Sequence, residues 1–188
     1  MDSDSNWPKD SETGEELALL ASLPGSFWQD AGAKLPNGYC LSIFLKHASG
    51  DRKTLRRMAV HEQSQQSKLS AAPIKVLIHH MAQPAISSTH TMPVTPMLEI
   101  KLKAPAEEDR DPAMPDRGTT VSKLGGVPGW AQDEINIPGH KYVLQFEELE
   151  LAKACPAWAG VFGGGNGFLF IKELKGNIES GIFFVQFT

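Results

Sequence analysis

Two apolar segments near the C-terminus constrain the fold more than any other feature of the sequence. FLFIKE (residues 168–173) and IFFVQF (residues 182–187) are separated by the polar connection LKGNIESG (residues 174–181). Both segments are apolar on both alternating faces, which is typical of interior strands in a sheet that is covered on each side. The Gly-Asn pair in the connection is a turn signal and predicts a hairpin. We therefore expect a sheet whose two faces are both buried.

The glycine-rich run GGGNG (residues 163–167) directly precedes the first of these strands. A Walker phosphate loop needs a strand before it, a helix after it and a Lys-Ser/Thr pair at its end, and this run has none of the three. A Rossmann glycine turn also needs a helix to follow. The run therefore predicts a tight turn with positive φ angles and close backbone approach, and no phosphate site.

Apolar patterning places further strands along the chain. Segments bounded by turn residues predict strands at residues 37–47, 73–81, 97–103 and 142–152, and residues 54–63 favour a strand over a helix. Residues 14–23 predict one short amphipathic helix, because Leu17, Leu20 and Ala21 recur at helical spacing and Pro24-Gly25 follows. The predicted fold class is mainly β (α+β), an antiparallel sandwich-like domain with a short N-terminal helix.

The domain organisation follows from polarity. Residues 1–16 are acidic and aperiodic, which predicts a flexible arm. Residues 17–188 are expected to form a single β-rich domain, with a proline- and charge-rich loop at residues 104–119. A division into two lobes at this loop remains the alternative.

Charge and cysteine usage exclude several classes of protein. The net charge of -4 and pI of about 5.9 argue against nucleic-acid binding, which needs an excess of basic residues. No signal peptide and no apolar run of about 20 residues is present, so we expect a cytoplasmic protein without membrane contact. Cys40 and Cys155 stand alone in dissimilar contexts and predict buried, reduced thiols without a disulfide or zinc site.

The histidines are the first candidates for catalysis. His79, His80 and His90 lie within twelve residues of one another. Adjacent strand residues point to opposite faces, so His79 and His80 cannot both join His90, and no carboxylate lies at metal-ligand spacing. Cys40 lies mid-strand, a poor place for a reactive thiolate. We expect no enzyme, metal or cofactor; the alternative is a metal-dependent hydrolase or small-molecule-binding protein with a histidine-containing cleft.

The C-terminal third carries an ordered set of motifs. KLGGVPGWAQDE (residues 123–134) is followed by YVLQFEEL, FGGGNGFLFIKE and GIFFVQFT. This order resembles the YwqG-like family of β-rich proteins over residues 120–188. The matching positions are Lys123, Gly125, Gly126, Pro128, Trp130, Gln145, Phe162, Gly163, Gly167 and Gln186. The resemblance implies a sheet-rich domain without established catalytic residues, in a fold whose relatives include immunity proteins encoded beside bacterial toxins.

Runs of carboxylates suggest the function. Such runs usually form a solvated face, but a protein that blocks a cationic active site also presents carboxylates, which speed association. The acidic balance and the absence of an assembled catalytic set lead us to expect a non-catalytic protein-binding protein. The family resemblance implies its sharpest form, an immunity protein that neutralises a cognate toxin, such as a nuclease, by occluding its active site. The predicted contacts are Asp133, Glu134, Glu147 and Glu148, with Trp130 as an aromatic anchor. The alternative for Trp130 is core packing, the more common role of a tryptophan.

Overall fold

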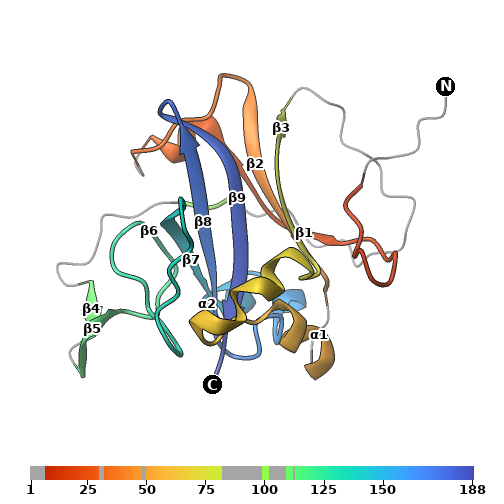
Figure 1. Ribbon diagram of the computed structural model, residues 1–188, viewed down its shortest axis with the longest axis vertical. Coiled ribbons are helices and arrows are strands. Elements are labelled where there is room, and N and C mark those ends of the chain that lie inside the picture. The colour runs from red at the N-terminus through yellow and green to blue at the C-terminus, as the bar shows by residue number, and fades with distance from the viewer. Residues whose placement is uncertain (1–6, 30–31, 48–49, 82–98, 102–108, 112) are drawn as a thin grey trace.

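Two antiparallel sheets form the body of the protein (Figure 1). The computed structural model describes residues 7–29, 32–47, 50–81, 99–101, 109–111 and 113–188. The first sheet has the order β1-β2-β3, with strands Ala18–Pro24, Tyr39–Leu45 and Ile74–His80. The second has the order β6-β7-β8-β9, with strands Lys123–Leu124, Lys141–Glu147, Asn166–Leu174 and Asn177–Gln186. The prediction of a mainly β (α+β) domain is confirmed.

Short helices lie in the connections between the strands. They comprise α1 (Arg52–Met58) and α2 (Glu148–Ala154) and the 3-10 helices η1 (Gly25–Trp28), η2 (Gln63–Ser70) and η3 (Pro156–Trp158). The strand favoured at residues 54–63 is wrong. Asp51 caps α1 by accepting a hydrogen bond from the Lys53 N–H, and the helix buries Leu55 and Met58. Likewise the strand predicted at residues 142–152 is shorter in the structure. Strand β7 ends at Glu147, and α2 begins at Glu148.

The predicted N-terminal helix is also wrong, because all its apolar residues after Leu17 belong to β1. A bulge between Leu19 and Ala21 shifts the pairing of β1 with β2. As a result Ala18, Ala21 and Leu23 are the buried positions of the strand. The spacing of three created by the bulge resembles one turn of a helix, which is why the sequence pattern was misleading.

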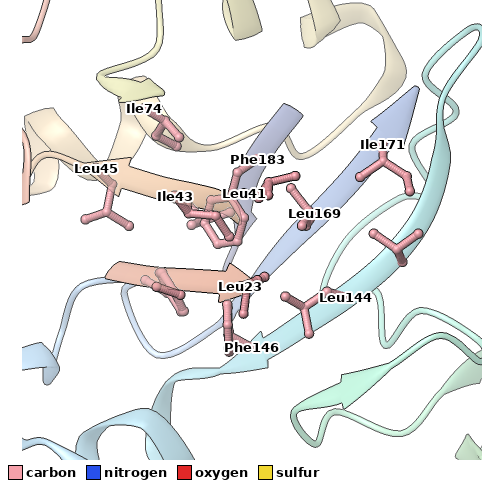
Figure 2. Packing of buried hydrophobic residues seen from close by; sticks show 14 of the residues in the cluster. Leu23, Leu41, Ile43, Leu45, Ile74, Leu144, Phe146, Leu169, Ile171 and Phe183 are labelled. Carbon is pink, nitrogen blue, oxygen red and sulfur yellow. The ribbon is translucent and has the colours of Figure 1, made fainter. Parts of the chain in front are cut away.

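The main core lies between the two sheets (Figure 2). Leu41, Ile43 and Leu45 project from one face of β2 toward the second sheet, whose inward side chains include Leu169 and Phe183. Each is at most 2% exposed. Burial of a side chain of this size contributes about 1.5 to 3 kcal/mol, so this layer fixes how the sheets face each other.

The opposite face of the four-stranded sheet is also covered. Phe168, Phe170 and Phe184 form a second cluster with Trp130 and Ile135 from the β6–β7 loop. The Trp130 and Phe168 ring centroids lie 4.7 Å apart. Alternate residues of β8 and β9 therefore enter two different cores, as the two-sided apolar pattern predicted.

The β8–β9 connection is a two-residue hairpin. Leu174 pairs with Asn177, and the residues between them, Lys175 and Gly176, have φ angles of 51° and 80°. Two consecutive positive φ angles define the type I′ turn, whose twist matches that of paired strands. The predicted hairpin is confirmed, with Lys175-Gly176 at its centre.

Much of the predicted flexible arm is fixed to the domain. The Trp7 Nε1–H donates to the Leu17 carbonyl at 2.7 Å, and the Trp7 ring packs edge-on against Phe44. The Asp10 side chain is fully buried and forms two hydrogen bonds with the Arg57 guanidinium of α1. Flexibility is therefore the wrong description of residues 7–16, and residues 1–6 lie outside the described residues.

The proline-rich segment lies partly outside the described residues, as does most of the strand predicted at residues 97–103. The described portion of the proline-rich segment contains a short antiparallel pair of strands, β4 (Arg110–Asp111) and β5 (Met114–Gly118). Residues 99–101 lie in no strand. None of the described helices has the length and apolar character required to cross a membrane.

Candidate functional site

Three buried amide side chains hold the loop between β6 and β7 against the sheet. Gln145, Asn166 and Gln186 come from the neighbouring strands β7, β8 and β9 and are 0%, 3% and 0% exposed. We call these three residues the amide clasp. The Asn166 Nδ2–H donates to the Gly129 carbonyl at 2.9 Å, while Gln145 Oε1 accepts from the Gly129 N–H at 2.7 Å. Both polar groups of one loop residue are thus bound by the sheet.

Gln186 binds the far end of the same loop. Its Oε1 accepts from the N–H groups of Ala131 and Gln132, both at 3.2 Å, and its Nε2–H donates to the Asp133 carbonyl at 2.8 Å. The clasp satisfies backbone groups that the aromatic cluster beneath the loop would otherwise leave unpaired. It therefore fixes the position of the segment that carries Asp133 and Glu134.

Replacing Gln186 with leucine is expected to lower the free energy of unfolding by about 2 to 3 kcal/mol, because two N–H groups and one carbonyl lose their partner in a buried site. Urea denaturation measures the change. Gln132→Leu is the matched control, since the Gln132 side chain makes one hydrogen bond, to the Phe187 carbonyl at 3.2 Å. Equal losses in the two variants would contradict a structural role for the clasp.

A second fastening holds the start of this loop. Lys123 Nζ and the Val127 N–H donate to the Asp109 carboxylate at 2.5 and 2.6 Å, and Thr119 Oγ1 is also within hydrogen-bond distance at 3.2 Å. Burial acts to raise the pKa of Asp109, but the hydrogen bonds from Lys123 and Val127 outweigh it and lower that pKa. Lys123 thus has a structural partner within the turn.

Two of the predicted contact residues are exposed at the end of the clasped loop. Asp133 and Glu134 both face solvent. The Asp133 N–H donates to the His61 carbonyl at 3.1 Å, which places Asp133 beside the start of η2, where Glu62 is also exposed. Carboxylates from segments about seventy residues apart in sequence are therefore neighbours.

Glu147 lies at the same end of the sheet. It pairs with Asn166 of β8, and Asn166 pairs with Gln186 of β9. Gln186 is the residue that binds the Asp133 carbonyl. Two strand spacings separate the backbones of Glu147 and Gln186, about 10 Å. The Glu147 side chain is half-buried and caps α2 by accepting from the N–H groups of the next turn.

Glu150 and two apolar side chains surround Glu147. The exposed Glu150 accepts from the Ser122 N–H at 2.8 Å, and Ser122 Oγ accepts from the Glu147 N–H at 2.9 Å. These bonds bring the β6 side of the loop to the start of α2. Val121 and Leu149, on either side of this link, are 46% and 63% exposed. The region therefore combines carboxylates with accessible apolar surface.

Glu148 points into the protein. Glu148 is 6% exposed. Its carboxylate accepts hydrogen bonds from the N–H groups of Gly160, Phe162 and Gly164 at 3.0, 2.5 and 3.0 Å. The predicted assignment of Glu148 to a partner surface is therefore corrected, since both carboxylate oxygens are used internally. Trp130, 7% exposed, is corrected for the same reason, because its ring belongs to the second core cluster.

The glycine run is a turn, as predicted, but it also serves an internal anion. Gly163 and Gly164 have φ angles of 67° and 82°, and a Cβ at Gly165 would lie 1.9 Å from the Gln186 carbonyl oxygen. The N–H groups around the run converge on the Glu148 carboxylate, in the manner of a backbone nest for an anion. The sequence of the glycine run alone does not indicate that its N–H groups bind a carboxylate of the same chain, that of Glu148.

The histidines lie as the strand periodicity predicts, on opposite faces of β3. The His79 Nε2 atom lies 2.9 Å from Ser42 Oγ and 3.3 Å from Cys40 Sγ on the outer face of the sheet, while His80 packs edge-on against Tyr39 on the other face. His90 lies outside the described residues. Sequence reasoning missed the Cys40–His79 contact because it depends on the β2–β3 register.

The buried nucleophiles beside His79 do not make an accessible catalytic site. Ser42 and Cys40 are 1% and 4% exposed, so neither reaches a substrate in this conformation. Across the ranges that the structure describes, no group of three or more His, Cys, Asp or Glu residues is arranged to hold a metal. The histidine-containing cleft remains a prediction.

Comparison with known proteins gives no assignment. No family model matches the chain, and no curated protein or solved structure matches it. The resemblance to the YwqG-like family therefore remains a prediction from the sequence motifs.

Proposed function

We propose that this domain is a non-catalytic protein-binding module that contacts a basic surface of its partner. One observation supports the proposal most directly: carboxylates from three separate segments gather at one end of the four-stranded sheet. This acidic end consists of Glu62 at the start of η2, Asp133 and Glu134 on the clasped loop, and Glu147 and Glu150 at α2. Such an arrangement speeds association with a positively charged partner and fixes its register.

The rigidity of this end favours binding. The amide clasp holds the loop that carries Asp133 and Glu134, and capping of α2 holds Glu147. A surface that is ordered before association loses less conformational entropy on binding. The exposed Val121 and Leu149 add apolar contact area beside the carboxylates. The proposal therefore combines steering by charge with a preformed contact surface.

In its sharpest form the proposal makes the protein an immunity protein that binds a cognate toxin and occludes its active site. Nuclease active sites attract phosphate and are often cationic, so an acidic surface complements them. The resemblance of residues 120–188 to the YwqG-like family supports the same interpretation, by analogy of fold alone.

An affinity pull-down from the cells that express the protein, read by mass spectrometry, should return one stoichiometric partner. The partner's affinity is then measured for Asp133→Lys/Glu134→Lys, which we expect to bind at least about tenfold more weakly, mainly through slower association at low salt. The matched control is Glu173→Lys/Glu179→Lys, which makes the same charge change near the β8–β9 hairpin, where the two glutamates pair with Lys141 and Lys172.

The outcomes distinguish protein binding through the acidic end from immunity by occlusion of the partner's active site. A partner that binds both double variants equally would contradict the acidic end as the contact surface, and an empty bait would contradict the binding function. A partner whose own enzymatic activity persists in the complex would contradict immunity by occlusion while leaving the binding function in place.

A further inference from the structure

A hollow of about 490 Å³ opens where α1, the glycine run and the end of β9 meet. In Figure 1, α1 and the C-terminus lie at the same end of the molecule. Two arginines of α1, Leu55, three glycines, Phe187 and Thr188 line it. The lining residues that matter here are Arg52, Leu55, Arg56, Gly163 and Phe187. The hollow has no role in the acidic end described above.

Two arginine side chains bring positive charge to the hollow. Arg52 and Arg56 are one helical turn apart, so their side chains share a face of α1, and both are exposed. Neither guanidinium forms an ion pair with any residue in the described part of the chain. Arg57 of the same helix differs, because its guanidinium is bound to Asp10. Two guanidinium groups without an ion-pair partner among the described residues therefore border the hollow.

The opposite wall is apolar and fixed. The Phe187 ring packs edge-on against the His61 ring, with centroids 4.7 Å apart, and Gln132 Nε2 donates to the Phe187 carbonyl at 3.2 Å. A Cβ at Gly163 would lie 3.2 Å from Phe187 Cγ and 3.4 Å from Leu55 Cδ1, within the space between these side chains. Because position 163 lacks a Cβ, Phe187 and Leu55 pack closely over the turn and together form this apolar wall.

We propose that the hollow binds a phosphate monoester carried on a small apolar body, such as a ring. Guanidinium groups bind phosphate oxygens through paired N–H donors, and two of them match the charge of close to -2 that a monoester carries at neutral pH. Leu55 and Phe187 supply the apolar contact for the body of the ligand. This binding site is independent of the acidic end and of the protein partner proposed for it.

Isothermal titration calorimetry with phenyl phosphate tests the proposal on the full chain. We expect saturable binding that Arg52→Gln/Arg56→Gln weakens at least tenfold. Lys53→Gln on the same helix is the control for charge alone and should change the affinity less than twofold, because Lys53 does not line the hollow. Inorganic phosphate, which lacks an apolar body, should bind at least about fivefold more weakly than phenyl phosphate.

Three results would overturn the proposal. The first is an absence of saturable binding of phenyl phosphate up to about 10 mM, beyond the range of a specific small-ligand site. The second is an equal loss of affinity in the double arginine variant and in Lys53→Gln, which would indicate unspecific attraction. The third is equal affinity for phenyl phosphate and inorganic phosphate, which would remove the role of Leu55 and Phe187. Unfolding curves of each variant establish that the substituted surface residues leave the fold intact.

Discussion

Replacing Glu148 with alanine is expected to lower the free energy of unfolding by about 3 to 5 kcal/mol, because a buried carboxylate with three backbone donors is lost. The N–H groups of Gly160, Phe162 and Gly164 converge on it, and the bond from Phe162 is buried. Hydrogen bonds to a charged acceptor contribute more than neutral ones, and an unpaired donor in a dry site carries its full desolvation cost. The glycine run would then lose the group that holds it closed.

Urea denaturation of three variants measures this effect. Glu148→Gln should lie between wild type and Glu148→Ala, because one side-chain oxygen still accepts while the amide N–H₂ faces backbone donors. Glu150→Ala is the control, since Glu150 is exposed and accepts one backbone hydrogen bond, and its loss should stay below about 1 kcal/mol. If Glu148→Ala costs no more than Glu150→Ala, the internal anion does not stabilise the run.

The same substitution connects the core to both candidate binding regions. Glu148 follows Glu147, which caps α2 at the acidic end, and its carboxylate holds the turn that contains Gly163 of the hollow. Glu148 is therefore adjacent in sequence to a residue of the acidic end and holds the turn that lines the hollow. Weak binding by a Glu148 variant would therefore report lost structure, and the charge reversals and arginine substitutions at the surface are the proper tests of function.

The C-terminal hairpin of β8 and β9 was predictable because its signals are local. Near-continuous apolar runs identify β8 and β9 as strands covered on both faces, and a two-residue turn between them fixes the register within a few residues of sequence. Phe183 and Phe184 enter different clusters as a direct consequence of strand periodicity. No knowledge of distant contacts was needed for this part.

The N-terminal half failed where distant contacts decide local structure. The bulge in β1 is set by pairing with β2, so the spacing of Ala18, Ala21 and Leu23 had no local explanation. Thr54 to Met58 fit a strand or a helix, and the choice of helix rests on the Asp51 cap and on burial against the core. Propensity alone is a weak guide in both segments.

The candidate site was predictable only as a set of exposed carboxylates. Asp133 and Glu134 are exposed as expected, whereas the run of Glu147, Glu148 and Glu150 contains one residue that turns inward. The position of the β7–α2 boundary relative to the glycine run decides which glutamate turns inward. The N–H groups that bind Glu148 belong to residues 12 to 16 positions further along the chain. The proximity of Glu62 to Asp133 likewise depends on one tertiary hydrogen bond, from the Asp133 N–H to the His61 carbonyl.

Replacing Asp10 with asparagine is expected to lower the free energy of unfolding by about 3 kcal/mol at neutral pH, because Asp10 is fully buried and its charge is compensated within the fold. The Arg57 Nη1 and Nη2 atoms donate to its two oxygens at 2.8 Å each, and the Glu12 N–H and Thr13 Oγ1 donate at 3.0 Å. Removing the Asp10 charge leaves the partly buried Arg57 guanidinium with only the exposed Glu12 as an ion-pair partner among the described residues. The exposed Glu12 also pairs with Arg57, at 2.7 Å, and Glu12→Gln is the control, with an expected loss below about 1 kcal/mol.

The stabilisation by Asp10 should disappear in acid. The hydrogen bonds from Arg57 hold the pKa of Asp10 far below its ordinary value. A carboxyl group whose pKa is lower in the folded state stabilises the fold above its unfolded pKa, near 4, and this contribution falls as the pH drops further, by up to about 1.4 kcal/mol per pH unit. Unfolding of wild type and Asp10→Asn should therefore differ most at neutral pH and converge below about pH 4. A difference that stays constant down to pH 3 would show that packing around residue 10, and not the ion pair with Arg57, fastens residues 7–16 to α1.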